Sequence, residues 1–292
     1  MKRVGIWKRK PSYQNLILSE RVMTKHNYFK TKSMHINELF SLDGRCAVVI
    51  GGAGKVGFSM AEALAEAGAR VYIASRSAKN FQPAVERLKS AGLKVAGIAI
   101  DQADESSVLK TLDFISNEYK TPDILINSGC YRPMKNFYND STESWDESME
   151  VNSRGLFITC RTFGDAMARQ GKGSIINISS IYGMVAPDMS IYDGVDFETE
   201  PDYPFVKGGI ITYSKYLSSY YSKQNVRVNC ISPGGVFNNQ EEPFLGNYEK
   251  RTPLGRMANP NDMKGIALFL ASEASGYITG SVIPVDGGWT AI

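Results

Sequence analysis

Short apolar runs alternate with amphipathic stretches along the chain from Leu42 onward. The runs are rich in β-branched residues and have the length of strands. Several are apolar throughout, as expected for parallel strands that are covered on both faces. Between them, segments such as 58–68 and 141–169 repeat their apolar residues at helical spacing. The predicted strands are 45–50, 70–74, 94–100, 123–127, 174–179, 226–231 and 281–285.

This alternation predicts an α/β fold, a doubly wound (Rossmann) parallel sheet of about seven strands with helices on both faces. No internal repeat and no linker rich in proline or serine divides the pattern, so we expect a single domain over residues 36–292. Hydrophobic residues make up 43% and charged residues 22% of the chain, which excludes a wholly disordered protein. No apolar run approaches the roughly 18 residues of a membrane span, so no membrane association is expected.

The basic character of the chain is concentrated at its start. Residues 1–33 contain nine Lys or Arg and one acid, Glu20, and therefore carry +8, whereas the other 259 residues carry −5. The body offers no basic stripe for nucleic acid. Residues 1–35 make a poor secretory signal and only a weak transit peptide. We expect a basic, disordered extension there, either dispensable or acting as a functional arm.

Cysteine and histidine usage narrows the chemistry. The four cysteines are far apart and form no CxxC pair, which excludes a disulfide framework and is typical of a reducing, cytoplasmic compartment. Both histidines, His26 and His35, lie in or beside the basic segment. We therefore expect neither a metal site nor a Ser–His catalytic triad in the body.

A glycine-rich turn joins the first predicted strand to an Ala-rich helix. Gly52, Gly54 and Gly57 have the Gly-x-Gly-x-x-Gly spacing of a dinucleotide-binding turn, in the strand–turn–helix context that this motif requires. Glycine lets the backbone approach a pyrophosphate, and the helix N-terminus offers free N–H groups. The cofactor-binding residues expected in this turn are Gly51, Gly52, Gly54, Lys55, Val56 and Gly57.

The end of the second strand bears on cofactor choice. An acid there would bind a ribose 2′-hydroxyl and repel a 2′-phosphate, but this chain has Ser75 followed by Arg76. Arginine binds phosphate through paired hydrogen bonds, and Lys55 in the glycine turn could add a second charge. The pattern favours NADP(H) over NAD(H); the alternative is that both cations are ordinary surface residues.

Tyr203 and Lys207 lie four residues apart at the start of a helix predicted to reach about residue 223, so they share a face. A lysine one turn from a tyrosine favours the phenolate and makes the pair a candidate general acid/base. Moving a phenol pKa from ~10 to ~7 takes about 4 kcal/mol. A unit charge about 4 Å away supplies about that much at an effective dielectric of 20.

Together with NISS (177–180), these motifs resemble the short-chain dehydrogenase/reductase family, over roughly residues 36–292. The resemblance implies a catalytic tetrad of Asn152, Ser180, Tyr203 and Lys207, with Tyr203 and Lys207 also touching the cofactor. It also implies a small-molecule substrate and a homotetramer or homodimer. The further matches are Asp101, INSGC (126–130), VNSRG (151–155), RVNCISPGG (227–235) and GYITGSVIPVDGGW (276–289). The additional cofactor-binding residues that it implies are Asp101, Gln102, Asn127, Ser128, Gly129, Pro233, Gly234 and Val236.

The chain departs from the family pattern in ways that leave alternatives open. Ile50 replaces a threonine, and the spacing Gly51-x-x-Gly54-x-x-Gly57 is that of the epimerase-like branch. Ser180 and Tyr203 are 23 residues apart, and the extra segment is acidic. It is either a solvated loop or the rim of a pocket for sugar-like substrates, and its carboxylates argue against anionic ones. The acids are Asp188, Asp193, Asp196, Glu198, Glu200 and Asp202.

We therefore expect an NADP(H)-dependent oxidoreductase that interconverts a carbonyl and a secondary alcohol on a polar or sugar-like substrate. Two alternatives stay open at this point. One is a sugar epimerase or dehydratase, which the glycine spacing suggests. The other is a nicotinamide-binding regulatory protein without turnover. A stripe of tyrosines on the helix that carries Lys207 is expected in the core or at a subunit interface: Tyr213, Tyr216, Tyr220 and Tyr221.

Overall fold

The computed structural model describes residues 33–292, of which residues 36–292 form one compact unit. The basic segment 1–32, where an extension is predicted, lies outside the described residues. All seven predicted strands are present, each end within two residues of its expected position. They are β1 (Cys46–Ile50), β2 (Arg70–Ser75), β3 (Val95–Ala99), β4 (Ile124–Asn127), β5 (Gly173–Ile178), β6 (Val226–Pro233) and β7 (Val282–Val285).

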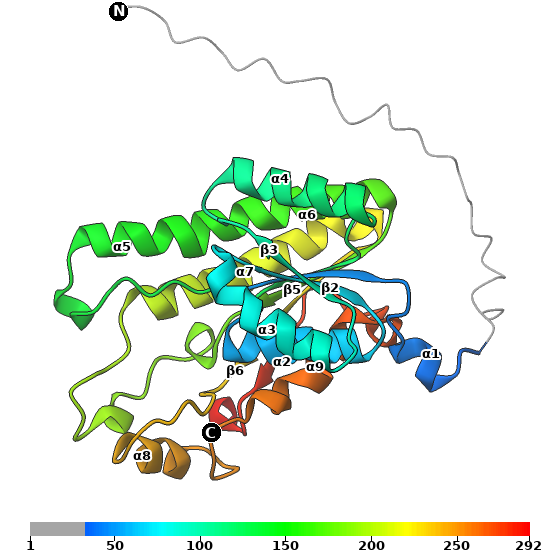
Figure 1. Ribbon diagram of the computed structural model, residues 1–292. Coiled ribbons are helices and arrows are strands. Elements are labelled where there is room, and N and C mark those ends of the chain that lie inside the picture. Colours follow the sequence, from blue (N-terminus) through cyan, green and yellow to red (C-terminus); the bar gives the residue numbers. More distant parts are fainter. Residues whose placement is uncertain (1–32) are drawn as a thin grey trace, which may run out of the picture. The chain divides into compact units, whose positions relative to one another are not determined.

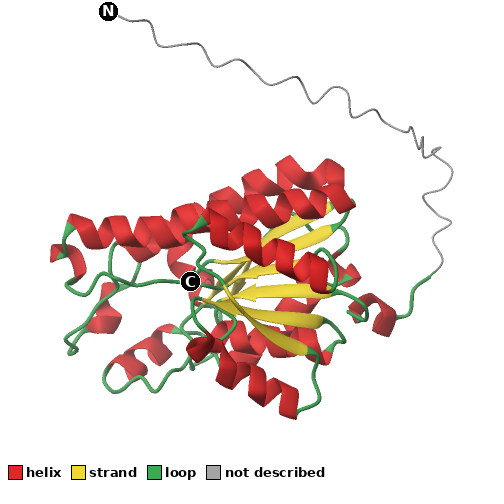
Figure 2. Ribbon diagram, turned by 45° about the horizontal axis from the view of Figure 1, so that its top comes forward, coloured by secondary structure: helices red, strands yellow, loops and turns green. Residues whose placement is uncertain are grey.

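The strands form one parallel sheet in the order β3-β2-β1-β4-β5-β6-β7 (Figures 1 and 2). The predicted Rossmann-type fold is thus confirmed. The chain winds outward from β1 in one direction and then returns to place β4 on the other side of β1. At such a reversal of strand order, the loops leave the carboxyl ends of β1 and β4 in opposite directions and open a crevice.

Helices cover both faces of the sheet. In Figure 1, α4, α5 and α6 lie above the strands and α2, α3 and α9 lie below them. The helices are α1 (Ile36–Phe40), α2 (Lys55–Glu66), α3 (Ala78–Ser90), α4 (Glu105–Glu118), α5 (Thr142–Met149), α6 (Gly155–Gln170), α7 (Asp202–Tyr221), α8 (Phe244–Arg251) and α9 (Lys264–Ala271). Within residues 33–292, no helix is both long and apolar enough to cross a bilayer.

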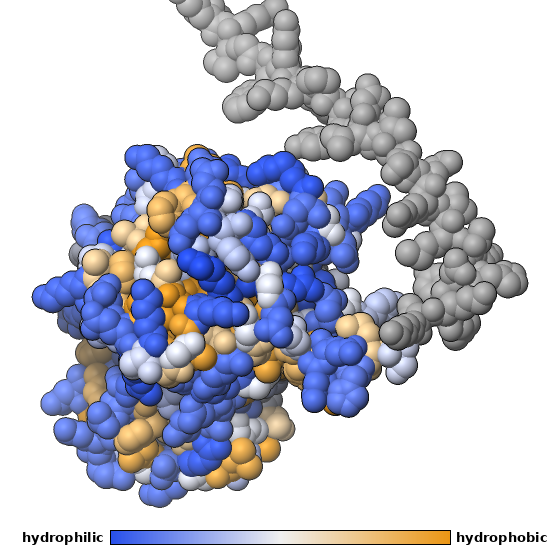
Figure 3. All heavy atoms as spheres, turned by 45° about the vertical axis from the view of Figure 1, so that its right-hand side comes forward, coloured by the Kyte–Doolittle hydropathy of each residue, from blue (hydrophilic) through white to orange (hydrophobic). Residues whose placement is uncertain are grey.

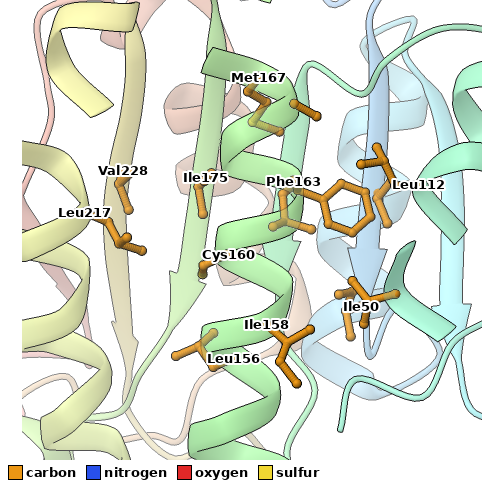
Figure 4. Close-up of a cluster of buried hydrophobic side chains, with 14 of the residues drawn as sticks. Ile50, Leu112, Leu156, Ile158, Cys160, Phe163, Met167, Ile175, Leu217 and Val228 are labelled. Carbon is orange, nitrogen blue, oxygen red and sulfur yellow. The ribbon is translucent and has the colours of Figure 1, made fainter. Parts of the chain in front are cut away.

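Alternate residues of β1 divide the interior into two cores. Val48 and Ile50 face α4, α6 and α7, whereas Ala47 and Val49 face α2, α3 and α9. Figure 4 shows the first core, in which Phe163 on α6 lies over the strands. Full burial of one such side chain contributes about 1.5–3 kcal/mol. Because β1 faces a hydrophobic core on each side of the sheet, its sequence is apolar throughout.

A third, smaller cluster lies beyond the carboxyl ends of the strands. Ile191 from the acidic segment packs there with Phe244 and Tyr248 of α8 and with Trp289 near the C-terminus. Ile191 is only 1% exposed. The segment between Ser180 and Tyr203 is therefore anchored to the body, and it is not a freely solvated loop.

Candidate active site

The glycine turn is shaped by two close backbone approaches. Gly51 has a φ of +74°, and a Cβ on it would lie 2.6 Å from the Gly129 nitrogen. A Cβ on Gly57 would lie 2.3 Å from the Gly51 carbonyl oxygen. Only glycine fits at these two positions. The turn passes through Gly54 into α2, so free N–H groups and the positive end of the helix dipole meet at the crevice, as an anionic pyrophosphate requires.

A cavity of about 440 Å³, here called the glycine-turn cavity, opens beside this turn. It runs from the carboxyl end of β1 past those of β2, β3 and β4. Its size, its glycine cradle and its polar donors fit the adenosine half of a dinucleotide. The predicted cofactor residues that line it are Gly51, Gly54, Ser75, Arg76, Asp101, Gln102, Ser128 and Gly129.

The two cations assigned to a 2′-phosphate are placed differently. Arg76 lines the glycine-turn cavity, and its guanidinium carbon lies 5.1 Å from the ring centroid of Tyr131. Lys55 lines neither this cavity nor the one described next. Its ammonium donates instead to the Phe237 carbonyl oxygen at 3.3 Å. Only Arg76 thus faces the ribose end of the crevice.

A second cavity, of about 340 Å³, adjoins the first through Ser128 and Cys130; we call it the tyrosine cavity. Ser180 reaches it from the residues after β5, and Tyr203 and Lys207 reach it from the first turns of α7. The other predicted cofactor residues along its wall are Val56, Pro233, Gly234 and Val236. The fold thereby brings residues distant in sequence to one wall.

The ammonium of Lys207 is buried beside Tyr203. Its side chain is 5% exposed, and Nζ donates to the Ile178 carbonyl oxygen at 2.9 Å. Nζ lies 5.4 Å from the centroid of the Tyr203 ring. Ser180 Oγ accepts the Tyr182 N–H at 3.2 Å, which leaves its own hydrogen available for another acceptor. The cavity thus contains a phenol, a hydroxyl donor and a cation.

Asn152 lies behind this wall, where the structure differs from the sequence pattern. The amphipathic stretch 141–169 is not one helix, because a π-helical turn, Glu150–Arg154, separates α5 from α6. Such turns are rare and often occur at functional sites. Asn152 lines a small inner cavity of about 10 Å³ together with Gln102, Asn127 and Lys207. That volume and its polar lining suit one water molecule.

Sequence reasoning missed Arg132. Its guanidinium carbon lies 4.6 Å from the Tyr203 ring centroid, and it pairs with Glu200 at the edge of the tyrosine cavity. Burial lowers the pKa of Arg132, but the Glu200 carboxylate outweighs this and holds it above its usual value. An arginine two residues after the INSGC motif has no distinguishing spacing, so only the fold reveals it.

The acidic segment contributes to the tyrosine cavity, although not through its acids. Tyr192 and Thr199 line the cavity, and none of the six carboxylates does. Glu200 pairs with Arg132, and Asp202 accepts a hydrogen bond from Ser148. Of the two readings, the rim of a pocket is the closer one. The expected repulsion of anionic substrates would therefore not come from direct contact with these acids, since the charged side chains that line the cavity are Arg132 and Lys207.

Three further tyrosines of this cavity stay protonated. Burial raises the pKa of Tyr248 to about 12 and also raises the pKa values of Tyr182 and Tyr192. The hydroxyls of Tyr182 and Tyr192 lie 3.3 Å apart. Together with Gln240 they give the cavity a lining of neutral hydrogen-bonding groups.

The sequence matches the family described as enoyl-(acyl carrier protein) reductase over residues 51–290. It is 33% identical to the 3-oxoacyl-(acyl-carrier-protein) reductase FabG of Chlamydia trachomatis over 85% of this chain and 98% of that one. It is 32% identical to the D-threitol dehydrogenase of Mycolicibacterium smegmatis, over 86% and 95% respectively. The chain belongs to the short-chain dehydrogenase/reductase family.

Solved structures of this family superimpose closely. A gluconate 5-dehydrogenase from Burkholderia cenocepacia in complex with NADP and tartrate has a TM-score of 0.80 at 27% identity, covering 88% of this chain and 100% of its own. A short-chain dehydrogenase from Leptospira borgpetersenii with bound NAD⁺ has a TM-score of 0.78 at 34% identity, covering 91% and 99%. This short-chain dehydrogenase/reductase is an oxidoreductase that acts on an alcohol or carbonyl of a small molecule with a nicotinamide cofactor.

Proposed function

We propose that this enzyme interconverts a secondary alcohol and a ketone on a small polyhydroxylated substrate, such as a polyol or a sugar acid, with NADP(H). The observation that carries the proposal is the lining of the tyrosine cavity. Besides Tyr203 and Ser180, it presents Tyr182, Tyr192, Thr199, Gln240 and Tyr248, which are neutral donors and acceptors suited to substrate hydroxyls. Such a lining rejects an analogue that lacks the matching hydroxyls, because the buried polar groups would then remain unpaired.

The chain's own residues manage the proton. When bound, the nicotinamide dinucleotide supplies the hydride chemistry. Tyr203 gives its hydroxyl proton to the substrate oxygen during reduction and removes it during oxidation. The Ser180 hydroxyl donates to the same oxygen, and the Lys207 ammonium stabilises the negative charge that develops on Tyr203. Asn152, at the inner cavity, would anchor a water that returns the proton through Lys207.

Arg132 extends the substrate class to acids. Its guanidinium lies over the Tyr203 ring at the edge of the cavity, where a substrate carboxylate could displace Glu200. The gluconate 5-dehydrogenase of known structure acts on such a sugar acid by its name and was solved with tartrate. This likeness supports, for the present chain, sugar acids beside neutral polyols.

The preference for NADP(H) rests on Arg76. This residue lines the glycine-turn cavity beside Ser75, and stacking on Tyr131 orients its guanidinium before any ligand binds. The acid that would select a free 2′-hydroxyl is absent at position 75. Lys55 is not part of this argument, since it contacts Phe237.

A substrate screen followed at 340 nm tests the function. Threitol, galactitol and gluconate would be oxidised with NADP⁺, their keto forms reduced with NADPH, and acetoacetyl-coenzyme A offered as an acyl substrate. The proposal expects turnover of at least one polyol or sugar acid, lost in Tyr203→Phe. Turnover confined to the acyl thioester would instead favour the reaction of the acyl-carrier-protein reductases.

We also propose that the enzyme is a homodimer or homotetramer. The tyrosine stripe on α7 divides: Tyr221 is buried, whereas Tyr216 and Tyr220 are 61% and 55% exposed, beside Phe157 of α6 at 45%. On the face shown in Figure 3, hydrophobic side chains form patches among hydrophilic ones. Contiguous exposed aromatics of this kind mark association surfaces. Light scattering of wild type and Tyr216→Lys tests this, since the charge should shift the species toward smaller mass.

A further inference from the structure

A hydrogen-bonded chain connects the start of α7 to Asn152. Asp202, which is 3% exposed and directly precedes Tyr203, accepts from the Ser148 hydroxyl of α5. Ser148 Oγ in turn accepts from Asn152 Nδ2 at 3.0 Å. The second N–H of that amide donates to the Tyr131 carbonyl oxygen at 2.6 Å, and Asn152 Oδ1 accepts the Tyr131 N–H at 2.8 Å.

The donor and acceptor of each of these hydrogen bonds follow from Asp202, where the series begins. The Ser148 hydroxyl donates to Asp202, so its hydrogen points to the carboxylate and a lone pair of Oγ is left for Asn152. The Asn152 amide must then present its NH₂ group to Ser148 and its oxygen to the Tyr131 N–H. With the amide reversed, its oxygen would face the Ser148 lone pairs and the Tyr131 carbonyl. The Tyr131 backbone favours this orientation of Asn152, and Asp202 supports the same orientation through Ser148.

Joining the two helices does not by itself require a charge. Trp145 of α5 and Phe205 of α7 already pack with ring centroids 5.2 Å apart, one turn from the polar pair. A buried carboxylate is costly unless it is hydrogen-bonded. Its place in the first turn of α7, at the positive end of the helix dipole, offsets part of that cost. The Asp202 carboxylate therefore contributes by orienting the Ser148 hydroxyl.

We propose that Asp202 and Ser148 form a positioning pair that holds the Asn152 amide in one orientation. The inner cavity and the Tyr131 backbone thereby stay aligned with Tyr203 and Lys207. The inference rests on the proposed roles of Asn152 and Tyr203. Neither Asp202 nor Ser148 lines the tyrosine cavity or the glycine-turn cavity, so neither is a catalytic residue. Their effect reaches the reaction through Asn152.

The test compares Ser148→Ala with Ser148→Thr, which keeps the hydroxyl. In Ser148→Ala we expect kcat to fall about 10- to 100-fold, as for a misaligned reacting group. KM should stay within about twofold, because the tyrosine cavity keeps its lining, and the Kd for NADPH should change less than kcat, because Tyr131 is only one of the residues that line the glycine-turn cavity. The solvent isotope effect on kcat should rise as proton transfer becomes limiting. Ser148→Thr should recover most of the rate, and Asp202→Asn, which can still accept from Ser148, should lose less than Asp202→Ala.

Matched controls lie nearby on the same elements. Ser144→Ala, one turn earlier on α5, and Asp193→Asn, an exposed acid of the same loop, should leave kcat unchanged. If Ser148→Ala does not fold, Asp202→Asn carries the same comparison. The proposal is overturned if kcat stays within twofold, if threonine does not restore it, or if kcat, the affinity for NADPH and Tm fall together without a change in isotope effect.

A readout independent of turnover separates this inference from the proposed function. The Tyr131 N–H donates to Asn152, so its hydrogen exchange should speed up at least tenfold in Ser148→Ala, and not in Ser144→Ala. If the wild type turns over no screened substrate, the proposed function fails while this measurement still tests the pair. Unchanged exchange at Tyr131 would refute the positioning role.

Discussion

Asp123 and Asp202 are both buried carboxylates, but they lie at opposite ends of the sheet. Asp123 precedes β4 and is 2% exposed; it accepts the Cys46 N–H at 2.9 Å and pairs with Lys120 at 2.9 Å and Lys172 at 3.1 Å. Asp202, at the carboxyl-end side, has a hydroxyl for its partner. Asp123 is thus neutralised by lysines that reach the surface, whereas Asp202 is hydrogen-bonded to a neutral side chain.

The difference shows how the fold divides stability from function. At the amino ends, burial alone would raise the pKa of Asp123, but the Cys46 N–H and the lysines outweigh it and hold the pKa below its usual range. The partners of Asp123 are groups of the protein itself, and Asp123 lines neither cavity. At the carboxyl ends, Ser180, Tyr203 and Arg132 direct their polar groups into a cavity. Substitutions at the two ends should therefore separate activity from unfolding free energy.

The largest expected effect is at the carboxyl ends. Tyr203→Phe should lower kcat by about 10²- to 10⁴-fold, the usual worth of a general acid or base. Cofactor Kd and Tm should stay close to wild type, because only one hydroxyl is lost. Steady-state kinetics, fluorescence titration of NADPH and thermal melts measure the three quantities.

Lys207→Met is the informative companion to that variant. It should weaken cofactor binding as well as turnover, since Lys207 lines the cavity and also stands beside Tyr203. A Tyr203→Phe enzyme that keeps more than half of the wild-type rate would remove Tyr203 from the proton-transfer role.

Cofactor discrimination is the next effect in size. Arg76→Ala removes a charge-assisted phosphate contact of roughly 1.5–3 kcal/mol. We expect NADPH to lose about tenfold or more in affinity while NADH is barely affected, and Ser75→Asp to reverse the preference. Calorimetric titration with NADPH and with NADH measures both affinities in each variant. Equal wild-type affinities for NADPH and NADH would show that Arg76 does not contact the phosphate, and Lys55→Ala, which should not change the ratio, is the matched control.

At the amino ends the expected change is in stability. Asp123→Asn should reduce the free energy of unfolding by about 1–3 kcal/mol, because the buried Cys46 N–H and two ammonium groups lose their charged acceptor. Urea unfolding measures this, and kcat should be unchanged. A loss of activity at wild-type stability would contradict the division between the two ends.

The same variant predicts a pH dependence. The folded pKa of Asp123 lies below its unfolded value, so its stabilisation is present above the unfolded pKa of about 3.9 and is lost as pH falls through the folded pKa. The difference between wild type and Asp123→Asn should be full at pH 7 and shrink below about pH 5. If the difference in unfolding free energy between wild type and Asp123→Asn instead grew on acidification, the lowered pKa of Asp123 would be contradicted.

The smallest effect is expected from the N-terminal segment. Every strand that the structure describes and every site residue lies within residues 36–292, so we propose that a chain starting at Met34 keeps the Tm, kcat and oligomeric state of the full chain. Melting curves and light scattering of both chains test this. A large loss on removal would identify residues 1–33 as an arm that acts on the body or a partner.

The motifs of this protein were readable because each depends on local geometry. The glycine turn needs particular φ angles and close approaches, and Tyr203 and Lys207 need only a helical turn between them. Arg132, Tyr192 and Thr199 lacked such a signal, because they reach the tyrosine cavity from loops, and the loop of Tyr192 and Thr199 is anchored by the third hydrophobic cluster. The contact of Lys55 with the Phe237 carbonyl oxygen likewise had no signal in the sequence, since Phe237 comes from a distant loop.

The sequence by itself determined the sheet, the family and the glycine turn, because hydrophobic period and steric demand act between near neighbours. Only the tertiary structure decided which charge faces the substrate cavity. The sequence does not indicate which charged residue reaches the cavity: Glu200 pairs with Arg132 and Asp202 with Ser148, and of these residues Arg132 lines the cavity. The physical reason is that a buried charge is tolerated only where a partner meets it, and partners far apart in sequence meet only once the chain has folded.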